Sequence, residues 1–303
     1  MDTEPNRESL TGMPRAQIER LAYIDFRLYF LGELRRADIS SHFGTGPAGA
    51  TRDIALYKEI APMNPDFDGV SKVYRPSSTF VPLFEHVPQR VLTALSQGYG
   101  EGPGGDLKPM VRCEFPTNLS QPRVEVIAPI ARAIHQGKAV RLKYFSNTSG
   151  ESEREVVPLA LVDSGVRWHV RVFDRKKSEF RDFVLTRITD PVVLDSSRVQ
   201  PEERADHDLQ WSRVIELELV PHPEHEHPET IKRDFNMPEG ILRVKVRAAN
   251  VGYMLRRWSV DCTTDHSLRG KEYMLWLRDP LVLYGAGNAV VAPGYRSPSS
   301  ATV

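Results

Sequence analysis

Residues 166–173 read Val-Arg-Trp-His-Val-Arg-Val-Phe, and this stretch decides the fold of the region around it. Apolar residues at Val166, Trp168, Val170 and Val172 alternate with nitrogen-rich residues at Arg167, His169 and Arg171. Successive side chains of a β-strand point to opposite faces of its sheet. The pattern therefore predicts a strand with one apolar and one basic face. We expect Trp168 and Val170 to pack in a core, and His169 and Arg171 to meet an anionic ligand.

Further short stretches on both sides of this strand predict a small β-domain. An amphipathic helix is expected over 126–135, followed by strands over 140–144, 154–162, 166–173 and 180–186, the second of them interrupted by Pro158. Turn-forming residues separate these strands at 147–150, 163–165 and 174–178. Four short strands with tight turns behind one helix suggest a small β-barrel.

This β-domain gathers side chains that suit a nucleotide or the end of a single-stranded nucleic acid. Guanidinium groups bind phosphate oxygens in pairs, and aromatic faces stack on bases. The predicted ligand-binding residues are Tyr144, Ser146, Arg154, His169, Arg171, Arg181 and Phe183. The alternative is an ordinary solvated face, whose arginines pair with the nearby acidic residues Glu153, Glu155, Asp174, Glu179 and Asp182.

A series of helices broken by glycines occupies the N-terminal part of the chain. The first predicted helix starts at Pro14, carries apolar stripes on two sides and ends at Gly32. A short helix over 35–43, the turn 44–46 and a third helix from Pro47 to about Ile60 follow. This order is the helix-turn-helix pattern. Residues 44–49 also match the GxGxxG signature of dinucleotide-binding proteins, but that signature requires a preceding strand, and here a helix precedes it.

The third helix predicts a DNA-reading surface. One of its faces is apolar and packs inward, whereas the other carries small residues with Thr51 and Arg52, which can enter a major groove closely. A β-wing is expected over 70–84. The predicted DNA-binding residues are Thr45, Pro47, Ala48, Thr51, Arg52, Lys58, Lys72 and Arg75. The alternative is a solvated helix in a small structural bundle.

The rest of the chain predicts a linker and a third domain. A helix over 88–97 precedes the glycine-rich residues 98–105, which read as a linker. Strands over 214–220, 241–247 and 273–277 alternate with helices over 223–235 and 250–258, which gives a small α+β module. The tail after Pro293 is expected to be disordered.

Composition narrows the class of protein. The 303 residues carry 40 basic and 40 acidic side chains, so any binding to a polyanion must come from local patches. Cys113 and Cys262 have neither zinc-site nor redox spacing, and the chain has no secretion signal or apolar run of membrane-spanning length. We therefore expect a cytoplasmic protein with reduced cysteines.

The sequence gives little support for a catalytic or metal-binding site. No nucleophile elbow, phosphate-binding loop or paired-carboxylate motif occurs, so we expect no enzyme, catalytic residue or cofactor. The run of histidines, prolines and glutamates over 222–227 could suggest a metal site. Its spacing argues against a preformed site, and a solvated acidic loop is the favoured interpretation.

The β-domain resembles a WYL domain. The residues that carry the likeness are Tyr144, the element 152–154, Pro158, the triplet 168–170 and the run 183–188. Their order, after a winged helix-turn-helix and before a small α+β extension, resembles the bacterial WYL transcriptional regulators, and within them the BrxR/CapW group of repressors. The likeness covers residues 14 to 293.

The resemblance implies an α+β multidomain protein. It implies a winged helix-turn-helix domain over 1–85, a linker over 86–124, an Sm-like β-barrel WYL domain over 125–200 and a dimerising C-terminal extension over 205–295. It further implies a homodimer that binds an inverted-repeat operator and represses an anti-phage defence operon. A nucleotide or nucleic-acid ligand in the WYL domain would release the DNA.

Two positions depart from the family pattern. The triplet is Trp-His-Val rather than Trp-Tyr-Leu, and Leu159 follows Pro158 where many members carry a histidine, so the ligand can differ. Two other functions stay open at this point. One is a transcriptional activator of DNA-damage genes, and the other is an RNA- or single-strand-binding module in which the barrel is the main binding surface.

Overall fold

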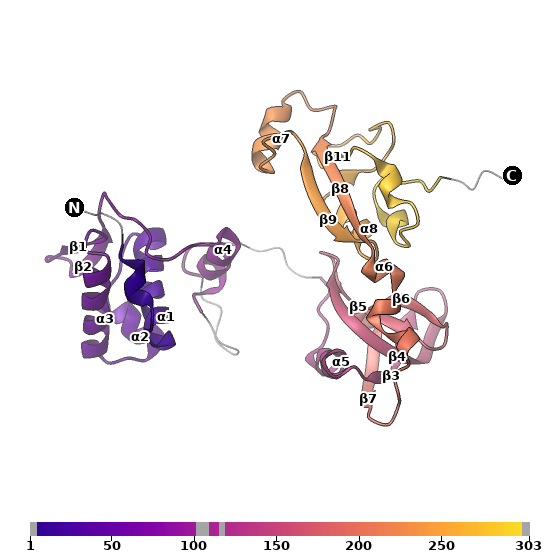
Figure 1. Ribbon diagram of the computed structural model, residues 1–303, viewed down its shortest axis with the longest axis horizontal. Helices are drawn as coiled ribbons and strands as arrows, with labels where there is room; N and C mark the ends of the chain where they lie inside the picture. The colour runs from indigo at the N-terminus through magenta and orange to yellow at the C-terminus, as the bar shows by residue number, and fades with distance from the viewer. Residues whose placement is uncertain (1–4, 101–108, 115–118, 299–303) are drawn as a thin grey trace. The chain divides into compact units, whose positions relative to one another are not determined.

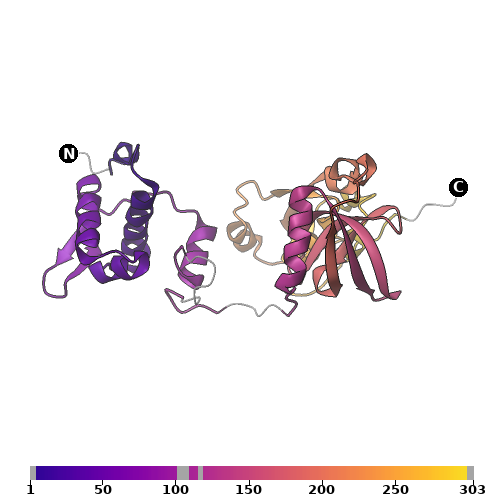
Figure 2. The ribbon, with the colours of Figure 1, turned by 90° about the horizontal axis from the view of Figure 1, so that it is seen from below.

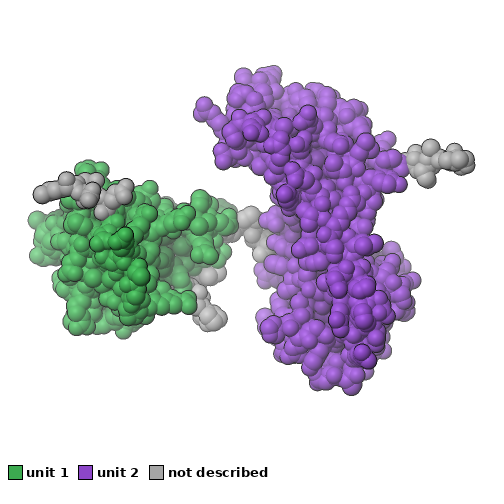
Figure 3. Space-filling model, in the orientation of Figure 1, with its two compact units in different colours: residues 1–116 green, residues 117–303 purple. Residues whose placement is uncertain are grey.

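The computed structural model describes residues 5–100, 109–114 and 119–298. The chain forms two compact units, Met1–Pro116 and Thr117–Val303 (Figures 1 and 3). Most of the predicted glycine-rich linker, residues 101–105, lies outside the described residues. Within those ranges, no helix is long and apolar enough to cross a membrane.

The N-terminal unit consists of helices and one β-hairpin. Its helices are η1 (Arg7–Leu10), α1 (Arg15–Phe26), the π-helical turn η2 (Arg27–Leu31), α2 (Arg36–Phe43), α3 (Pro47–Ile60) and α4 (Pro88–Gln97). Its strands β1 (Pro65–Asp68) and β2 (Val73–Pro76) pair antiparallel. Gly32 and Gly44 have φ of 72° and 63°. That left-handed region favours glycine, so the chain leaves the helix at both positions, as predicted.

A buried carboxylate links the helices of this unit to the segment after the hairpin. Asp25 is fully buried, and it accepts hydrogen bonds from the Tyr57 hydroxyl at 2.5 Å and the Leu83 N–H at 2.9 Å. The Asn64 side chain bonds both backbone groups of Val81, at 3.1 and 2.8 Å. Residues 77–84 are thereby held against the helices and form no strand. The predicted wing over 70–84 is therefore wrong in its bounds, because the hairpin spans 65–76.

The central domain of the second unit is a curled sheet with one helix (Figure 2). The helix is α5 (Val124–Gln136), and the strands are β3 (Ala139–Ser146), β4 (Gly150–Asp163), β5 (Trp168–Asp174), β6 (Glu179–Val184) and β7 (Ile188–Leu194), in the order β6-β5-β4-β3-β7. The register of β4 against β5 shifts between Pro158 and Ala160. A bulge is expected there because proline has no N–H for the ladder.

The predicted small Sm-like β-barrel is not confirmed. In the described residues β6 and β7 are the two edges of an open sheet. Only the 3-10 turn η3 (Leu185–Arg187) separates these edge strands in sequence, so the sheet must curl to bring its edges near each other. Tyr144 of β3 stacks on Phe183 of β6 with ring centroids 4.2 Å apart, which agrees with that curl. The sequence analysis predicted one strand over 180–186 and missed β7.

The C-terminal domain has a four-stranded sheet in the order β10-β11-β8-β9. Its strands are β8 (Val214–Pro221), β9 (Leu242–Arg247), β10 (Val260–Asp261) and β11 (Leu275–Leu277), and its helices are α6 (Leu209–Ser212), α7 (Pro228–Asp234) and α8 (Val251–Arg257). The short helices η4 (Pro201–Glu203) and η5 (Ala205–His207) lead into it, and η6 (Pro280–Leu283) and η7 (Ala289–Val291) follow the sheet.

The end of the chain is ordered further than predicted. The Pro293 carbonyl accepts a hydrogen bond from the Cys262 N–H at 2.9 Å, and Tyr295 packs on the core of the C-terminal domain. The chain therefore belongs to this domain as far as Tyr295, which corrects the first part of the expected disordered tail. Residues 299–303 lie outside the described residues.

Candidate functional site

The exposed face of α3 carries small residues, the cations Arg52 and Lys58, and the acid Glu59. Ala50, Ile54 and Tyr57 are buried, so the opposite side of the helix faces solvent, as predicted. That side carries Ala48, Thr51, Arg52, Ala55 and Lys58, all exposed, and Pro47 at its start is also exposed. The Thr51 hydroxyl donates to the Pro47 carbonyl at 2.9 Å, so its oxygen remains available as an acceptor. Such a face can enter a major groove without steric obstruction.

Cationic side chains of this unit are available for an anionic partner. Arg52, Lys58 and Lys72 are exposed and form no ion pair with any described residue. Lys72 lies at the tip of the β1–β2 hairpin, and Arg75 is exposed on β2. Thr45, in the turn before α3, has a buried hydroxyl oxygen without a hydrogen-bond partner among the described residues. The predicted DNA-binding residues lie on α3, its preceding turn and the hairpin, but the Thr45 hydroxyl is closed to solvent.

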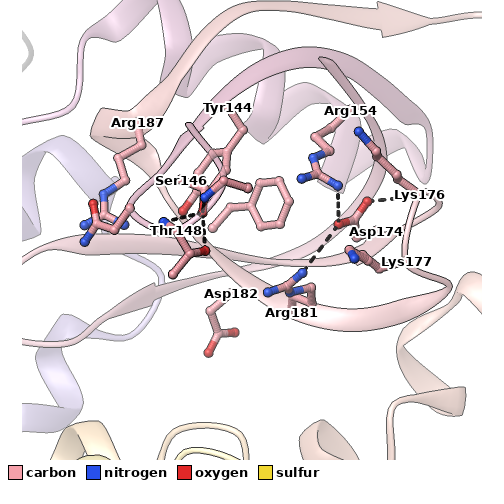
Figure 4. Close-up of a pocket in the computed structure, with 13 residues that line it drawn as sticks. Tyr144, Ser146, Thr148, Arg154, Asp174, Lys176, Lys177, Arg181, Asp182 and Arg187 are labelled. Carbon is pink, nitrogen blue, oxygen red and sulfur yellow. Dashed lines mark hydrogen bonds and ion pairs between the residues drawn. The ribbon is translucent and has the colours of Figure 1, made fainter. Parts of the chain in front are cut away.

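A cavity of about 520 Å³ opens in the curled sheet of the second unit (Figure 4). Strands β3, β4, β5 and β6 and the turns after β3, β5 and β6 supply its walls. Five cationic side chains line it against only two carboxylates. The lining residues are Tyr144, Ser146, Asn147, Thr148, Ser149, Arg154, Asp174, Lys176, Lys177, Arg181, Asp182, Phe183 and Arg187.

Two arginines in this cavity share one buried acid. Arg154 lies 3.4 Å from Asp174, which is fully buried, and its Nε donates to the Ser152 hydroxyl at 3.0 Å. Arg181 reaches the same carboxylate at 4.0 Å and Glu179 at 3.4 Å, and its side chain is 45% exposed. One carboxylate shared by two guanidiniums leaves donor groups for an incoming anion. Arg181 is the more accessible of the two.

The opposite wall of the cavity is aromatic and hydroxyl-bearing. Tyr144 and Phe183 are stacked and almost fully buried, and the Tyr144 hydroxyl accepts a hydrogen bond from the Val184 N–H at 3.3 Å. The Ser146 hydroxyl lies 3.0 Å from the Thr148 hydroxyl and accepts the Thr148 N–H at 3.2 Å. Hydroxyls and ring edges of this kind suit a sugar and a base next to a phosphate.

His169 and Arg171 lie on the other face of β5, away from the cavity. The Arg171 guanidinium donates to Asp208 at 2.7 and 3.0 Å and to Asp182 at 3.1 Å. His169 stacks on Tyr253 of α8 with ring centroids 5.0 Å apart, and burial lowers the pKa of its imidazole. Both residues are buried in the contact between the central and C-terminal domains.

Sequence comparison places all three domains in one family. Residues 16–97 match the model described as the BrxR transcriptional regulator winged helix-turn-helix domain. Residues 125–193 match the WYL domain, and residues 214–283 match the BrxR transcriptional regulator C-terminal dimerization domain. The DNA-binding transcriptional repressor CapW of Pseudomonas aeruginosa is 31% identical over 265 residues, which cover 84% of this chain and 86% of that one.

The chain belongs to the BrxR/CapW family of WYL-domain transcriptional regulators. The CapW repressor of Escherichia coli (strain KTE188) is 30% identical over 274 residues, covering 88% of this chain and 90% of that one. Among solved structures, the proteasome accessory factor PafBC of Arthrobacter aurescens matches at 17% identity and a TM-score of 0.24, over 84% of this chain and 47% of that one. The predicted family and domain order are confirmed.

Five of the seven residues predicted to bind ligand line the WYL cavity, and two do not. Tyr144, Ser146, Arg154, Arg181 and Phe183 are brought together there. The register pairs Arg171 with Asp182 and Val170 with Phe183. Paired residues point to the same face of the sheet. The Arg171 side chain therefore lies on the face with Asp182, and Phe183 lies on the other face. The expectation that His169 and Arg171 line the same site is corrected for this reason.

Trp168 is not a core residue either. It is 42% exposed, whereas Val170 is fully buried, as predicted. Residues 169 to 172 are buried on both faces of β5, because the C-terminal domain covers the face opposite the WYL core. The alternating pattern correctly predicted two faces for this strand but could not show that both are covered.

Several cavity residues were missed in the sequence. Lys176, Lys177 and Arg187 lie in the turns after β5 and β6, and residues 147–149 form the turn after β3. Turns carry no periodicity that predicts where a side chain points. Their signal was composition alone, since two lysines in the β5–β6 turn and three hydroxyl or amide residues in the β3–β4 turn resemble a loop-built anion site.

The histidine run over 222–227 forms no metal site in the described residues. His222 is buried, and its Nε2 lies 3.1 Å from an Asp261 oxygen, while its Nδ1 accepts the Glu224 N–H at 3.2 Å. His225 bonds the Tyr273 carbonyl at 3.0 Å. The expectation of a solvated loop is therefore wrong for His222, which is a structural histidine of the C-terminal domain.

Proposed function

We propose that this chain is a homodimeric repressor that binds an inverted-repeat operator of an anti-phage defence operon. A nucleotide or nucleic-acid ligand in the WYL cavity releases it from the DNA. The names of its relatives support repression, and the description of the model over 214–283 supports dimerisation. A dimer with two-fold symmetry places its two reading helices on two half-sites of opposite orientation.

The α3 face supports the DNA-binding end of this proposal. Its residues are small around Arg52, so the helix backbone can approach base edges and the guanidinium can reach a guanine or a phosphate. Lys58, Lys72 and Arg75 surround this face on α3 and the hairpin and suit phosphate contacts, which position the protein without reading sequence.

The lining of the WYL cavity is the single observation that supports the proposed binding of an anionic ligand. Five cations against two acids favour an anion, and Asp174 already engages Arg154 and Arg181. The stacked Tyr144 and Phe183 and the hydroxyls of the 146–149 turn provide contacts for a base and a sugar. A cationic or wholly apolar ligand would leave these charges without partners, which costs free energy in a partly enclosed site.

Release of the operator then follows from a shift in population. A ligand shifts the equilibrium only by the difference between its affinities for the released and the DNA-bound arrangements. A tenfold loss of operator affinity requires about 1.4 kcal/mol of differential binding. This is about what one charge-assisted hydrogen bond contributes.

A footprint on the DNA upstream of its own gene tests the proposed operator. We expect two protected half-sites, related by inversion and spaced by about one or more helical turns. In a deletion strain, reporter expression from this DNA should rise. A fall in expression would instead identify the activator. Loss of all footprints, with retained binding to single strands, would identify the single-stranded nucleic-acid-binding module.

A further inference from the structure

Strand β6 contacts two parts of the protein at once. Its Arg181 and Phe183 side chains line the WYL cavity, and Asp182 between them also borders the cavity but directs its carboxylate to Arg171 and Tyr253 (Figure 4). Alternation along a strand produces this division. A displacement of β6 that changes one face therefore changes the other.

The far face of β6 meets the C-terminal domain through a small set of contacts, which we call the latch. Asp182 accepts a hydrogen bond from the Tyr253 hydroxyl at 3.1 Å and from Arg171 at 3.1 Å. The same arginine makes a bidentate pair with Asp208, which caps the N-terminus of α6. His169 completes the latch by stacking on the Tyr253 ring.

The latch is nearly closed to solvent, so its contacts are strong. The Arg171 side chain is 7% exposed, the Asp182 side chain 10% and the Asp208 side chain 1%. Hydrogen bonds to charged groups that are shielded from water are worth more than those at the surface. Burial, and next the charge of Asp182, raise the pKa of the Tyr253 hydroxyl, which therefore remains a donor to Asp182 at neutral pH.

On the cavity side, the aromatic pair is closed in this structure. Phe183 is 3% exposed and Tyr144 is 8% exposed, and their rings stack directly on each other. The Tyr144 hydroxyl is held by the Val184 N–H of the same strand. A base cannot stack on either ring face unless Phe183 shifts, and Phe183 directly follows Asp182 of the latch.

A second ion-pair cluster joins the β5–β6 turn, which lines the cavity, to the segment before α6. Arg175 binds Glu203 through its Nε at 2.6 Å and its Nη2 at 2.8 Å, and it donates to the Arg198 carbonyl at 2.8 Å. The next residues along the chain, Lys176 and Lys177, line the cavity. Arg171 and Arg175 thus each bind an acidic residue, Asp208 and Glu203, in the segment that connects the central domain to the C-terminal domain.

We propose that the latch between Asp182 and Tyr253 holds β6 in the position that keeps Phe183 stacked on Tyr144, and that a ligand whose base displaces Phe183 weakens the latch. This inference rests on the proposed ligand-binding role of the WYL cavity. It identifies the C-terminal dimerisation domain as the part of the protein that responds first to the ligand. Reciprocity requires that a weaker latch makes the ligand bind more tightly.

The test compares the full-length chain with Tyr253→Phe, which removes one hydroxyl and keeps the ring on His169. Tyr284→Phe is the matched control, because Tyr284 is an exposed tyrosine of the same domain with no side-chain hydrogen bond to the described residues. Amide hydrogen exchange is measured over residues 179–184 without ligand. Binding of 5′-phosphorylated tetrathymidylate is measured by calorimetry.

Tyr253→Phe should increase exchange over residues 179–184 and tighten binding of the oligonucleotide by about three- to tenfold, whereas Tyr284→Phe should leave both unchanged. Equal exchange in Tyr253→Phe and wild type would overturn the latch, whether or not the oligonucleotide binds. Increased exchange together with no binding by any of the three proteins would support the latch and contradict the proposed ligand class. Asp182→Asn provides a second variant with the same expected increase in exchange.

Discussion

Replacing Arg171 with alanine is expected to lower the melting temperature of the second unit by about 6–12 °C. The guanidinium neutralises Asp208 and Asp182 at 2.7 and 3.1 Å, and Asp208 is almost fully buried. Removing one partner of a buried ion pair leaves an uncompensated charge and costs about 3 kcal/mol. For a unit of this size, each kcal/mol corresponds to roughly 2–4 °C. Calorimetry or urea unfolding measures the loss.

Arg141→Ala is the matched control for this prediction. Arg141 lies in the same domain, its side chain is 57% exposed, and its only ion pair among the described residues is with Glu153 at 3.8 Å. An exposed pair of this kind contributes little, so its loss should change stability by less than about 0.5 kcal/mol. If Arg171→Ala were as stable as Arg141→Ala, the domain contact described above would be wrong.

Arg52→Ala is expected to weaken operator binding by the dimer about 30-fold or more. A bidentate arginine contact to a base contributes about 1–3 kcal/mol of discrimination, and a dimer makes it twice. Arg52 is exposed on α3 and forms no ion pair within the described part of the chain, so its loss should not destabilise the domain. Fluorescence anisotropy at several salt concentrations measures both the affinity and its salt dependence.

Arg15→Ala serves as the control for Arg52→Ala. The Arg15 side chain is 93% exposed on α1, and among the residues that the structure describes its ion pair is with Glu19, four residues later. This variant should bind the operator like the wild type. A uniform loss across DNA sequences, with a shallower salt slope, would place Arg52 on a phosphate instead of a base. Undiminished affinity would remove α3 from the DNA interface.

The sequence predicted the helices better than the ligand site. The bounds of α3 and α4 agree with the prediction, because Pro47 and Pro88 begin these helices and Gly98 follows the second. The curled sheet was predicted with four of its five strands. The fifth strand, β7, was not predicted, and without it the two edges of the open sheet could not be identified.

Strand β5 packs one face on the WYL core and the other on the C-terminal domain. The second of these contacts is tertiary, and a local sequence pattern does not show it. Spacing showed that His169 and Arg171 share a face and that Arg181 and Phe183 share a face. The register of the hairpin decides whether these faces coincide, and a shift by one residue reverses the answer. Asp208, which captures Arg171, lies 37 residues away in sequence. The cavity and the latch were therefore merged into one predicted site.

The most direct test of the central claim is a titration of the full-length protein, bound to its upstream DNA, with 5′-phosphorylated tetrathymidylate. Arg181→Ala is the comparison, because Arg181 lines the cavity, is 45% exposed and is not part of the latch. We expect the oligonucleotide to release the wild type from DNA. Arg181→Ala should bind DNA equally well but require at least about tenfold more oligonucleotide for release. Release of both proteins at the same concentration, or of neither, would contradict the central claim.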